Sequence, residues 1–227
     1  MPNFDNSARF CGFLLSQPRK YLATHILMIL LMALYYAVCG WRSPVALLVV
    51  SVCLHLLGLG MLLILGQKDP GIVPKIFSDY ERQELQVIPI GRDYLSGSVR
   101  DFQKIFGMTI KTHSLKVKFC PTCLIFRPPR TSHCYDCNMC VERFDHHCPW
   151  IGTCVGKGNY PFFFAFVSSL WLLALLVLIQ AVMVCAGEGT QLGAPFYLNI
   201  LLGVLGLVVW LFLSSLFFFH IFLTLKD

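Results

Sequence analysis

The chain has 227 residues, of which 56% are hydrophobic and only 13% are charged. A soluble domain of this size does not need so much apolar material, so the composition excludes an ordinary soluble protein and predicts a membrane protein. The formal net charge of +6 suits an anionic leaflet or an anionic ligand, whereas nucleic acid is a poor partner for a chain so rich in apolar segments.

A short polar arm at 1–20 comes first in the chain, followed by apolar runs at 21–40 and 44–66. About 20 apolar residues cross a bilayer as a helix, so each run is long enough to span. The sequence RSP at 42–44 is too short for anything but a tight turn, which predicts a transmembrane hairpin over 21–66. The first run is too long for the apolar core of a signal peptide.

The stretch QKDPGIVPK breaks the second helix and opens a linker at 67–119, whose last part, KTHSLKVKFC, predicts a strand. A cysteine-rich segment at 120–160 follows, and apolar runs at 161–186 and 195–225 complete four spans. Four runs with almost no charge disfavour buried helices of a soluble core. The predicted fold is therefore an α-helical membrane protein with a small cytosolic zinc-stapled cysteine-rich domain between transmembrane helices 2 and 3.

Lysine and arginine predict the orientation of the spans. Thirteen of the 18 Lys and Arg residues lie between the second and third spans, and the two loops on the opposite side carry only Arg42. The positive-inside rule then places both termini and the cysteine-rich segment in the cytosol. Disulfides are rare there, so metal binding or catalysis better explains the clustered cysteines.

The segment at 120–154 concentrates residue types that bind zinc. A Cys-x2-Cys pair presents two thiolates to one tetrahedral ion, and several such pairs overlap here. Buried structural cysteines are a poor alternative, because the neighbouring residues are polar, and a domain this small needs a staple to fold. The ten candidate ligands are Cys120, Cys123, His133, Cys134, Cys137, Cys140, His146, His147, Cys148 and Cys154.

Two structural zinc ions use eight ligands, so two of the ten groups are spare. A spare cysteine and a spare histidine would form a thiol nucleophile and its base. Spacing alone does not say which two are spare. In an extended segment His146 and Cys148 share one face while His147 faces the other way, which favours His146 and Cys148. Asp145 could orient His146 if the backbone bends locally.

The pattern from Cys120 to Phe163, with the sequence DHHC at 145–148, resembles the Asp-His-His-Cys (DHHC) family of protein S-acyltransferases, or palmitoyltransferases. The resemblance covers 120–163 without a gap, and the DPG sequence at 69–71 and the order of the four spans agree with it. The family's Thr-Thr-x-Glu motif, expected to brace the active-site domain, would begin where this chain ends at LTLKD.

The resemblance implies a role for each candidate. One zinc ion is implied to bind Cys120, Cys123, His133 and Cys140. The other is implied to bind Cys134, Cys137, His147 and Cys154. In the implied ping-pong reaction, Cys148 attacks the thioester of an acyl-CoA, usually palmitoyl-CoA, with His146 as base and Asp145 orienting it. A cysteine thiol of a membrane-associated protein then takes the acyl chain. The segment at 120–160 is thus expected to be the catalytic domain.

Further expectations concern the co-substrate. Cys148 precedes the third span by a dozen residues, so an acyl chain could lie between helices while CoA stays in the cytosol. Arg127 and Arg130 are candidates for binding CoA phosphates, and Trp150 for the mouth of the acyl-chain cavity. Arginines that are solvated or contact lipid headgroups, and an ordinary interfacial tryptophan, are the alternatives.

Two other classes of function compete with an acyltransferase. A membrane-anchored zinc-binding interaction module without its own chemistry would leave Cys148 and His146 without a role. A transporter or channel would place polar residues inside the spans, where Gln180, Asn199 and three histidines are the main candidates. The resemblance to a branch of Golgi and ER enzymes that act on Ras-type proteins favours one of these membranes as the location. The sequence names no protein substrate and leaves room for an accessory subunit.

Overall fold

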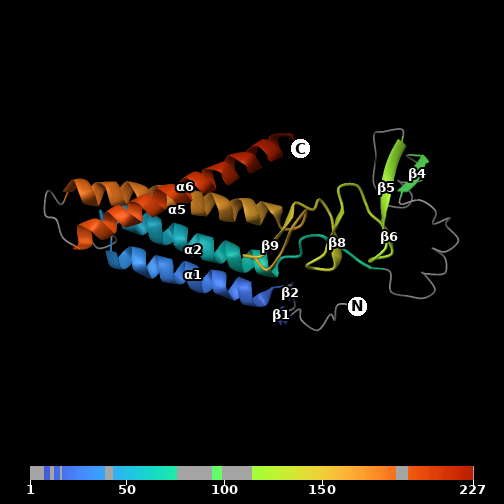
Figure 1. Ribbon diagram of the computed structural model, residues 1–227, viewed down its shortest axis with the longest axis horizontal. Coiled ribbons are helices and arrows are strands. Elements are labelled where there is room, and N and C mark those ends of the chain that lie inside the picture. The colour runs from blue at the N-terminus through green and yellow to red at the C-terminus, as the bar shows by residue number, and fades with distance from the viewer. Residues whose placement is uncertain are drawn as a thin grey trace.

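The computed structural model describes residues 8–10, 13–15, 17–38, 43–75, 94–98, 114–187 and 194–226. Its main body is a bundle of four helices, and its strands gather at one end of this bundle (Figure 1). The helices are α1 (Pro18–Val38), α2 (Val45–Gln67), α5 (Tyr160–Gly187) and α6 (Ala194–Lys226). All four are long and apolar enough to cross a membrane, which confirms the predicted spans.

Proline marks the start of every helix in the bundle. Pro18, Pro161 and Pro195 lie in the first turn of α1, α5 and α6, and Pro44 directly precedes α2. Proline fits these positions because the first N–H groups of a helix have no partner within the helix. With 33 residues, α6 is roughly 50 Å long at ~1.5 Å per residue, so it extends beyond a bilayer core of about 30 Å.

Helix α5 is the centre of the bundle and packs most extensively against α2 and α6. Trp171 of α5 donates a hydrogen bond to the Ser214 hydroxyl of α6 at 2.8 Å and stacks on Phe217 at 4.9 Å between ring centroids. Helix α1 packs less closely, and Tyr21 at its start lies against Leu62 and Gly66 of α2.

The histidine in the middle of the second span has a local structural explanation. His55 is 7% exposed, and its Nδ1 lies 3.0 Å from the Tyr36 hydroxyl and 2.9 Å from the carbonyl oxygen of Ser51. His25 similarly contacts the carbonyl oxygen of Tyr21, at 2.9 Å. Because both imidazoles bond within the hairpin of α1 and α2, neither supports the transporter alternative.

Within the described residues the strands are short and form four small antiparallel sheets. They are β1 (Ala8–Phe10), β2 (Phe13–Leu15), β3 (Ile72–Val73), β4 (Tyr94–Ser98), β5 (Ser114–Cys120), β6 (Ile125–Phe126), β7 (Ser132–Cys134), β8 (Met139–Val141), β9 (His146–Cys148) and β10 (Thr153–Val155). The sheet orders are β1-β2, β10-β9, β3-β8-β7 and β4-β5-β6. Strand β5 confirms the strand predicted before the first cysteine pair, whereas most of the predicted linker at 67–119 lies outside the described residues.

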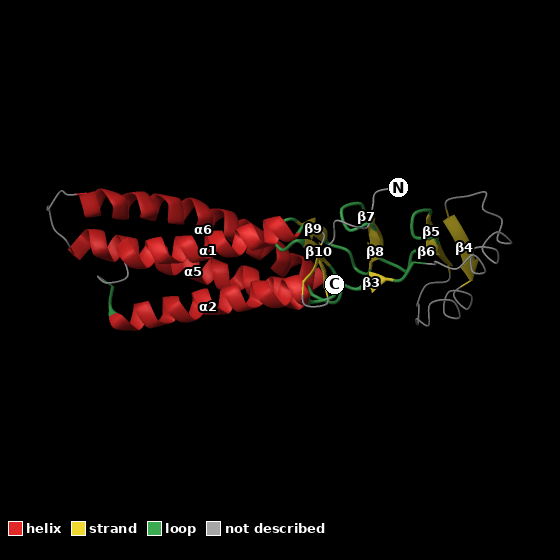
Figure 2. Cartoon of the chain, turned by 90° about the horizontal axis from the view of Figure 1, so that it is seen from below, coloured by secondary structure: helices red, strands yellow, loops and turns green. Residues whose placement is uncertain are grey.

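The last three sheets follow one another away from the helices (Figure 2). β9 and β10 lie against the helix ends, the β3-β8-β7 sheet lies farther out, and the β4-β5-β6 sheet is farthest. The strand pair that carries the DHHC sequence is therefore the part of the cysteine-rich region nearest to the apolar bundle.

The DPG sequence anchors the cysteine-rich region to the end of α2. The Asp69 carboxylate accepts hydrogen bonds from the backbone N–H groups of Gly71 and Ile72 at 2.8 and 2.9 Å, which closes a tight turn. The Pro70 carbonyl accepts from Gly158 N–H at 3.0 Å, and the Gly71 carbonyl accepts from Glu142 N–H at 2.8 Å. The chain thus leaves the membrane directly into the β3-β8-β7 sheet.

Candidate active site and metal centres

Two clusters of cysteine and histidine side chains lie in the strand region. In each cluster the ligand atoms of four residues lie within 4.8 Å of one another. The first cluster contains Cys120, Cys123, His133 and Cys140. The second contains Cys134, Cys137, His147 and Cys154. The structure therefore brings together the same two sets that the family resemblance implied.

The geometry of both clusters fits zinc. His133 Nδ1 lies 3.5, 3.4 and 3.8 Å from the sulfurs of the other members of its cluster. His147 Nδ1 lies 3.6, 3.4 and 3.6 Å from the sulfurs of its own cluster. A tetrahedral Cys3His site with usual zinc–ligand distances separates nitrogen and sulfur by about 3.6 Å. Burial also lowers the pKa of His133, which favours the neutral imidazole that a metal requires.

Strand pairing places the histidine of each cluster opposite a cysteine. His133 on β7 pairs with Cys140 on β8, and His147 on β9 pairs with Cys154 on β10. The Cys-x2-Cys pairs lie on turns, each followed by a residue with left-handed backbone, Leu124 at φ 56° and Asn138 at φ 51°. One turn and one hairpin thus supply each cluster.

The same pairing points the neighbours of His147 to the other face. His146 and Cys148 pair with Val155 and Thr153, so their side chains alternate with that of His147. Cys148 is the one cysteine between Cys120 and Cys154 that belongs to neither cluster. The structure thus separates His146 and Cys148 from both ligand sets, and it puts them on the same face of β9.

Asp145 contacts His146 directly. Its Oδ2 lies 2.8 Å from His146 Nδ1, a contact that is possible because Asp145 precedes β9 and does not follow the strand's alternation. Hydrogen bonds to Asp145 and Cys148 raise the pKa of His146 to about 9, and the bond to His146 lowers the pKa of Asp145. The arrangement favours an imidazolium that lies between the Asp145 carboxylate and the Cys148 side chain.

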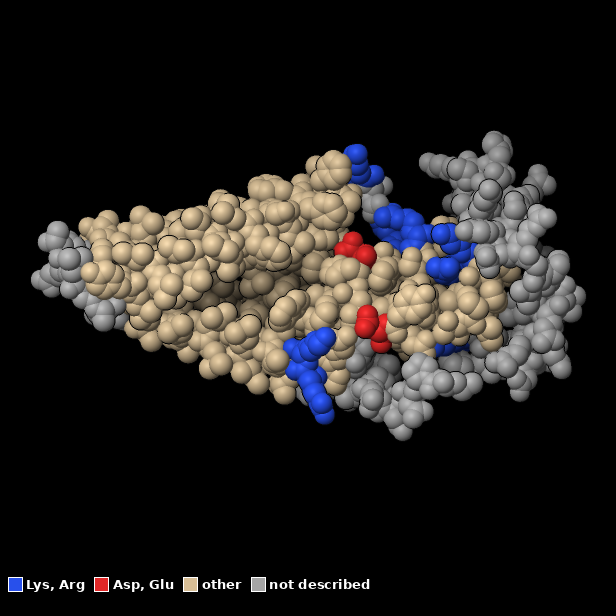
Figure 3. Space-filling model, in the orientation of Figure 1, with Lys and Arg blue, Asp and Glu red and all other residues tan. Residues whose placement is uncertain are grey.

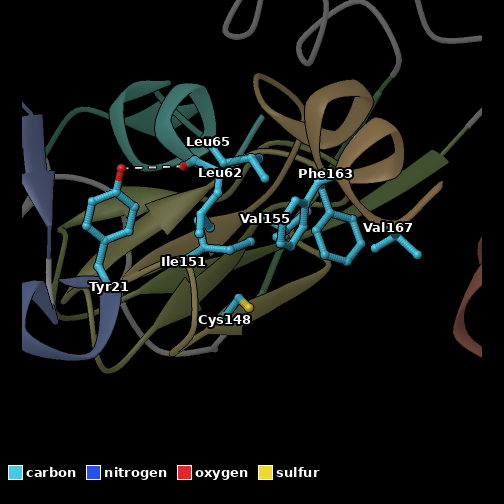
Figure 4. Packing of buried hydrophobic residues seen from close by; sticks show 9 residues of the cluster. Tyr21, Leu62, Leu65, Cys148, Ile151, Val155, Phe163 and Val167 are labelled. Carbon is cyan, nitrogen blue, oxygen red and sulfur yellow. Dashed lines mark hydrogen bonds between the residues drawn. The ribbon is translucent and has the colours of Figure 1, made fainter. Parts of the chain in front are cut away.

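Cys148 faces an apolar cluster that draws residues from several helices (Figure 4). The thiol is 8% exposed and packs with Ile151 and Val155 of its own hairpin. The other buried members are Tyr21 of α1, Leu62 and Leu65 of α2, and Phe163, Phe166 and Val167 of α5. Leu216 and Phe217 of α6 pack against this cluster. A nucleophile at this position lies between a polar surface and the apolar interior.

A pocket of about 890 Å³ lies beside the Asp145–His146 pair. Its lining includes Asp145 and Tyr160, together with five basic residues: Lys118, Arg127, Arg130, Arg143 and Lys157. The Nε atom of Arg127 is buried and has no hydrogen-bond partner among the described residues. Charged side chains gather at this end of the molecule, whereas the described helix surface is almost uncharged (Figure 3). The pocket is thus suited to an anionic ligand.

The predicted site residues occupy different environments. Arg127 and Arg130 line the basic pocket, whereas the Trp150 side chain is 64% exposed and lies outside the apolar cluster around Cys148. Sequence reasoning missed Arg143 and Lys157 as lining residues and did not place His220 near the site. His220 Nδ1 lies 3.0 Å from the hydroxyl of Tyr160, which is 60 positions earlier in the chain, and no spacing rule predicts such a contact. An isolated histidine in an apolar span is nevertheless itself a signal of function.

Comparisons with known proteins agree with this geometry. A family model described as DHHC palmitoyltransferase matches residues 113–227. The chain is 35% identical over 194 residues to "Probable protein S-acyltransferase 2" of Arabidopsis thaliana, a match over 81% of this chain and 47% of that protein. It is 40% identical over 155 residues to "Palmitoyltransferase ZDHHC9" of Homo sapiens, over 66% of this chain and 41% of that protein.

A further relative is "Protein S-acyltransferase 8" of Arabidopsis thaliana, which is 41% identical over 140 residues, or 60% of this chain and 34% of that protein. The chain therefore matches less than half the length of each of these relatives.

Proposed function

Because the chain belongs to the DHHC palmitoyltransferase family, we propose that it transfers a long-chain acyl group, palmitoyl foremost, from acyl-CoA to cysteine thiols of membrane-associated proteins. The observation that carries this proposal is the position of Cys148. It stands outside both metal clusters, beside His146, and it faces an apolar cluster at the end of the bundle. In this proposal the segment at 120–160 is the catalytic domain.

The reaction proceeds in two thiol exchanges. The Cys148 thiolate attacks the thioester carbon of acyl-CoA, the new C–S bond forms, and the bond to the CoA sulfur breaks. The imidazolium of His146 gives its proton to the departing CoA thiolate, while Asp145 keeps the ring oriented. In the second exchange the substrate's thiol loses its proton to His146, attacks the acyl-enzyme and releases Cys148.

The two metal clusters hold the catalytic strand in place. We assign one zinc ion to Cys120, Cys123, His133 and Cys140. We assign a second zinc ion to Cys134, Cys137, His147 and Cys154. When bound, each ion cross-links a small fold that lacks a large core. His147 and Cys154 lie on β9 and β10, so the second site fixes the hairpin that presents Cys148.

The basic pocket suits the phosphates of CoA. Arg127 and Arg130 offer charge-assisted hydrogen bonds to phosphate, and the unpartnered Nε of Arg127 supports a missing acceptor there. The acyl chain then extends from Cys148 among the apolar side chains of the bundle. Trp150, exposed beside the site, would contact the acyl chain or the bilayer surface.

The charge distribution supports a cytosolic active site in a multi-pass membrane protein. The basic residues gather at the end that carries the cysteine-rich region, as the positive-inside rule requires of a cytosolic face. We propose the Golgi or ER membrane as the location, because the RPPRTSHC and CVERFDHHCPW stretches resemble the branch found there. Because Cys148 lies at the boundary between the apolar bundle and the polar region, its protein substrates should carry cytosolic cysteines near the membrane. An accessory subunit is compatible with this scheme.

The test is covalent loading of the purified chain. Wild-type protein incubated with labelled palmitoyl-CoA should form an adduct on Cys148 that hydroxylamine releases, as mass spectrometry would locate it. Cys148→Ser should keep two zinc ions and its solubility but form no such adduct. Wild-type protein without a thioester-linked acyl group would refute the proposal, and loss of zinc from the serine variant would refute the assignment of Cys148. A zinc-binding module without chemistry is not favoured, because it leaves the Asp145–His146–Cys148 arrangement unexplained.

A further inference from the structure

A second histidine lies close to the catalytic pair, on a different helix. His220 of α6 is 2% exposed, and its Nδ1 lies 3.0 Å from the hydroxyl of Tyr160. Tyr160 is the first residue of α5 and also lines the basic pocket. The bond therefore joins the start of α5 to the C-terminal part of α6, beside the mouth of the site.

Phe163 connects His220 with His146. Its ring meets the His220 imidazole edge to face, with centroids 5.1 Å apart, and it meets the His146 imidazole in the same way at 5.3 Å. Phe163 is 4% exposed and belongs to the apolar cluster around Cys148. His220 is also close enough to interact electrostatically with both Asp145 and His146. The α6 helix thus contacts the catalytic residues through one aromatic ring.

The hydrogen bond between Tyr160 and His220 lies near the end of the contact between α5 and α6, and this position explains its importance. The described contacts that hold α5 against α6 elsewhere, such as Trp171 with Ser214, lie deeper in the bundle. Beyond them, α6 continues past His220 to its end at Lys226. A buried hydrogen bond at Tyr160 fixes the two helix ends relative to each other, and with them the ring of Phe163.

We propose that His220 is a positioning residue for acyl transfer: its hydrogen bond to Tyr160 holds Phe163 against His146 and so keeps the imidazole directed at Cys148. This inference rests on the proposed acyltransferase function. His220 touches neither substrate nor thiol in this role. Its effect is on the rate of the chemical step, because misplacement of a catalytic group by a fraction of an ångström slows attack without weakening substrate binding.

The experiment compares conservative variants of the full chain in detergent or vesicles. Tyr160→Phe removes only the hydroxyl, and His220→Phe removes the bond while keeping an aromatic ring against Phe163. Each should slow formation of the Cys148 acyl-enzyme at saturating palmitoyl-CoA about five- to tenfold, the effect of one lost hydrogen bond. For His220→Phe the KM for palmitoyl-CoA should stay within about twofold, because His220 does not line the basic pocket. The double variant should be no slower than either single variant.

Ser214→Ala is the matched control, since it removes a hydrogen bond between the same two helices away from the site. It should load at the wild-type rate. Rates of Tyr160→Phe and His220→Phe equal to wild type would overturn the inference and leave the proposed function standing. Additive losses in the double variant, or an equal loss in Ser214→Ala, would also overturn it. A wild-type protein that forms no acyl-enzyme would instead refute the proposed function on which the inference rests.

Discussion

His147 and Cys148 are neighbours in the chain, yet the structure gives them separate environments. Because side chains alternate along β9, His147 joins a metal cluster while His146 and Cys148 face the apolar side. In the proposed reaction, the buried Cys148 depends on His146 for activation, and His146 depends on Asp145. At the scale of single residues, the proposed chemistry therefore rests on one carboxylate and one imidazole that lie 2.8 Å apart.

Asp145→Asn tests this dependence. The hydrogen bond that His146 donates to Asp145 is the largest contribution to the raised pKa of His146, so the amide should lower that pKa. We expect acyl-enzyme formation to slow about tenfold or more, in the range of a lost general acid–base contribution. Rapid-quench measurement of the adduct gives the rate, and metal analysis should still find two zinc ions. A variant that loads at the wild-type rate would show that Asp145 does not orient the base.

Arg127 offers a second test, which concerns the binding of palmitoyl-CoA and not the rate of acyl transfer. Arg127→Ala should raise the KM for palmitoyl-CoA about tenfold, because it removes a charge-assisted contact to phosphate. The rate at saturation should change little. Arg19→Ala is the control, since Arg19 is exposed at the start of α1 and outside the pocket lining. Equal KM values for the two variants would contradict a CoA site in the basic pocket.

Short turns connect the bundle with the cysteine-rich region. The DPG turn after α2 bonds to the segment before α5, so the two ends of the region are held together where it meets the membrane. Asn159 adds to this junction: its buried side chain accepts from Gly156 N–H and donates to the Cys154 carbonyl, both at 2.9 Å. The β9–β10 hairpin is therefore held at the start of α5 by hydrogen bonds of the Asn159 side chain.

Gly158→Ala probes this junction at the scale of the element. A Cβ atom there would overlap the carbonyl oxygen of Asp69, and backbone on both sides leaves no room to shift. We expect a loss of about 1–3 kcal/mol of stability, seen as a lower unfolding temperature of the purified protein. Gly60→Ala is the control, because a Cβ atom at Gly60 meets nothing within 4 Å. An unchanged unfolding temperature for Gly158→Ala would show that the DPG turn is not a rigid anchor.

The whole molecule places one polar region at the end of an apolar bundle, with Cys148 at the boundary. The strands, the basic pocket and most charged residues lie on one side of this boundary, and the described helix surfaces on the other are apolar (Figures 1 and 3). A substrate with an anionic head and a long apolar tail matches this division. Acyl-CoA has this form, and its thioester lies where head and tail join.

Chain length should therefore affect binding more than chemistry. Each methylene buried among the bundle's side chains contributes ~0.8 kcal/mol, so an acyl chain two carbons shorter than palmitoyl should raise the KM up to about 15-fold. A series of acyl-CoAs, assayed below their micelle concentrations for acyl-enzyme formation, measures this dependence. A KM that does not vary with chain length would show that the acyl chain stays outside the bundle.

Much of this architecture is determined by the sequence. The four spans follow from long uncharged runs, since the bilayer requires each run to satisfy its backbone as a helix. The two ligand sets followed from the family pattern, and alternation in an extended segment singled out His146 and Cys148. These features are local or depend on regular spacing, so the order of residues is enough to predict them.

The tertiary structure decided which residues contact each other although they are far apart in the sequence. It brought Tyr160 and His220 together over 60 residues, gathered the five basic residues around one pocket, and set Cys148 against residues of α1, α2 and α5. It also brought the Asp145 carboxylate against His146, from which simple alternation would have turned it away. Helix packing and loop closure create these contacts, and they depend on the shapes of surfaces that meet only after the chain has folded.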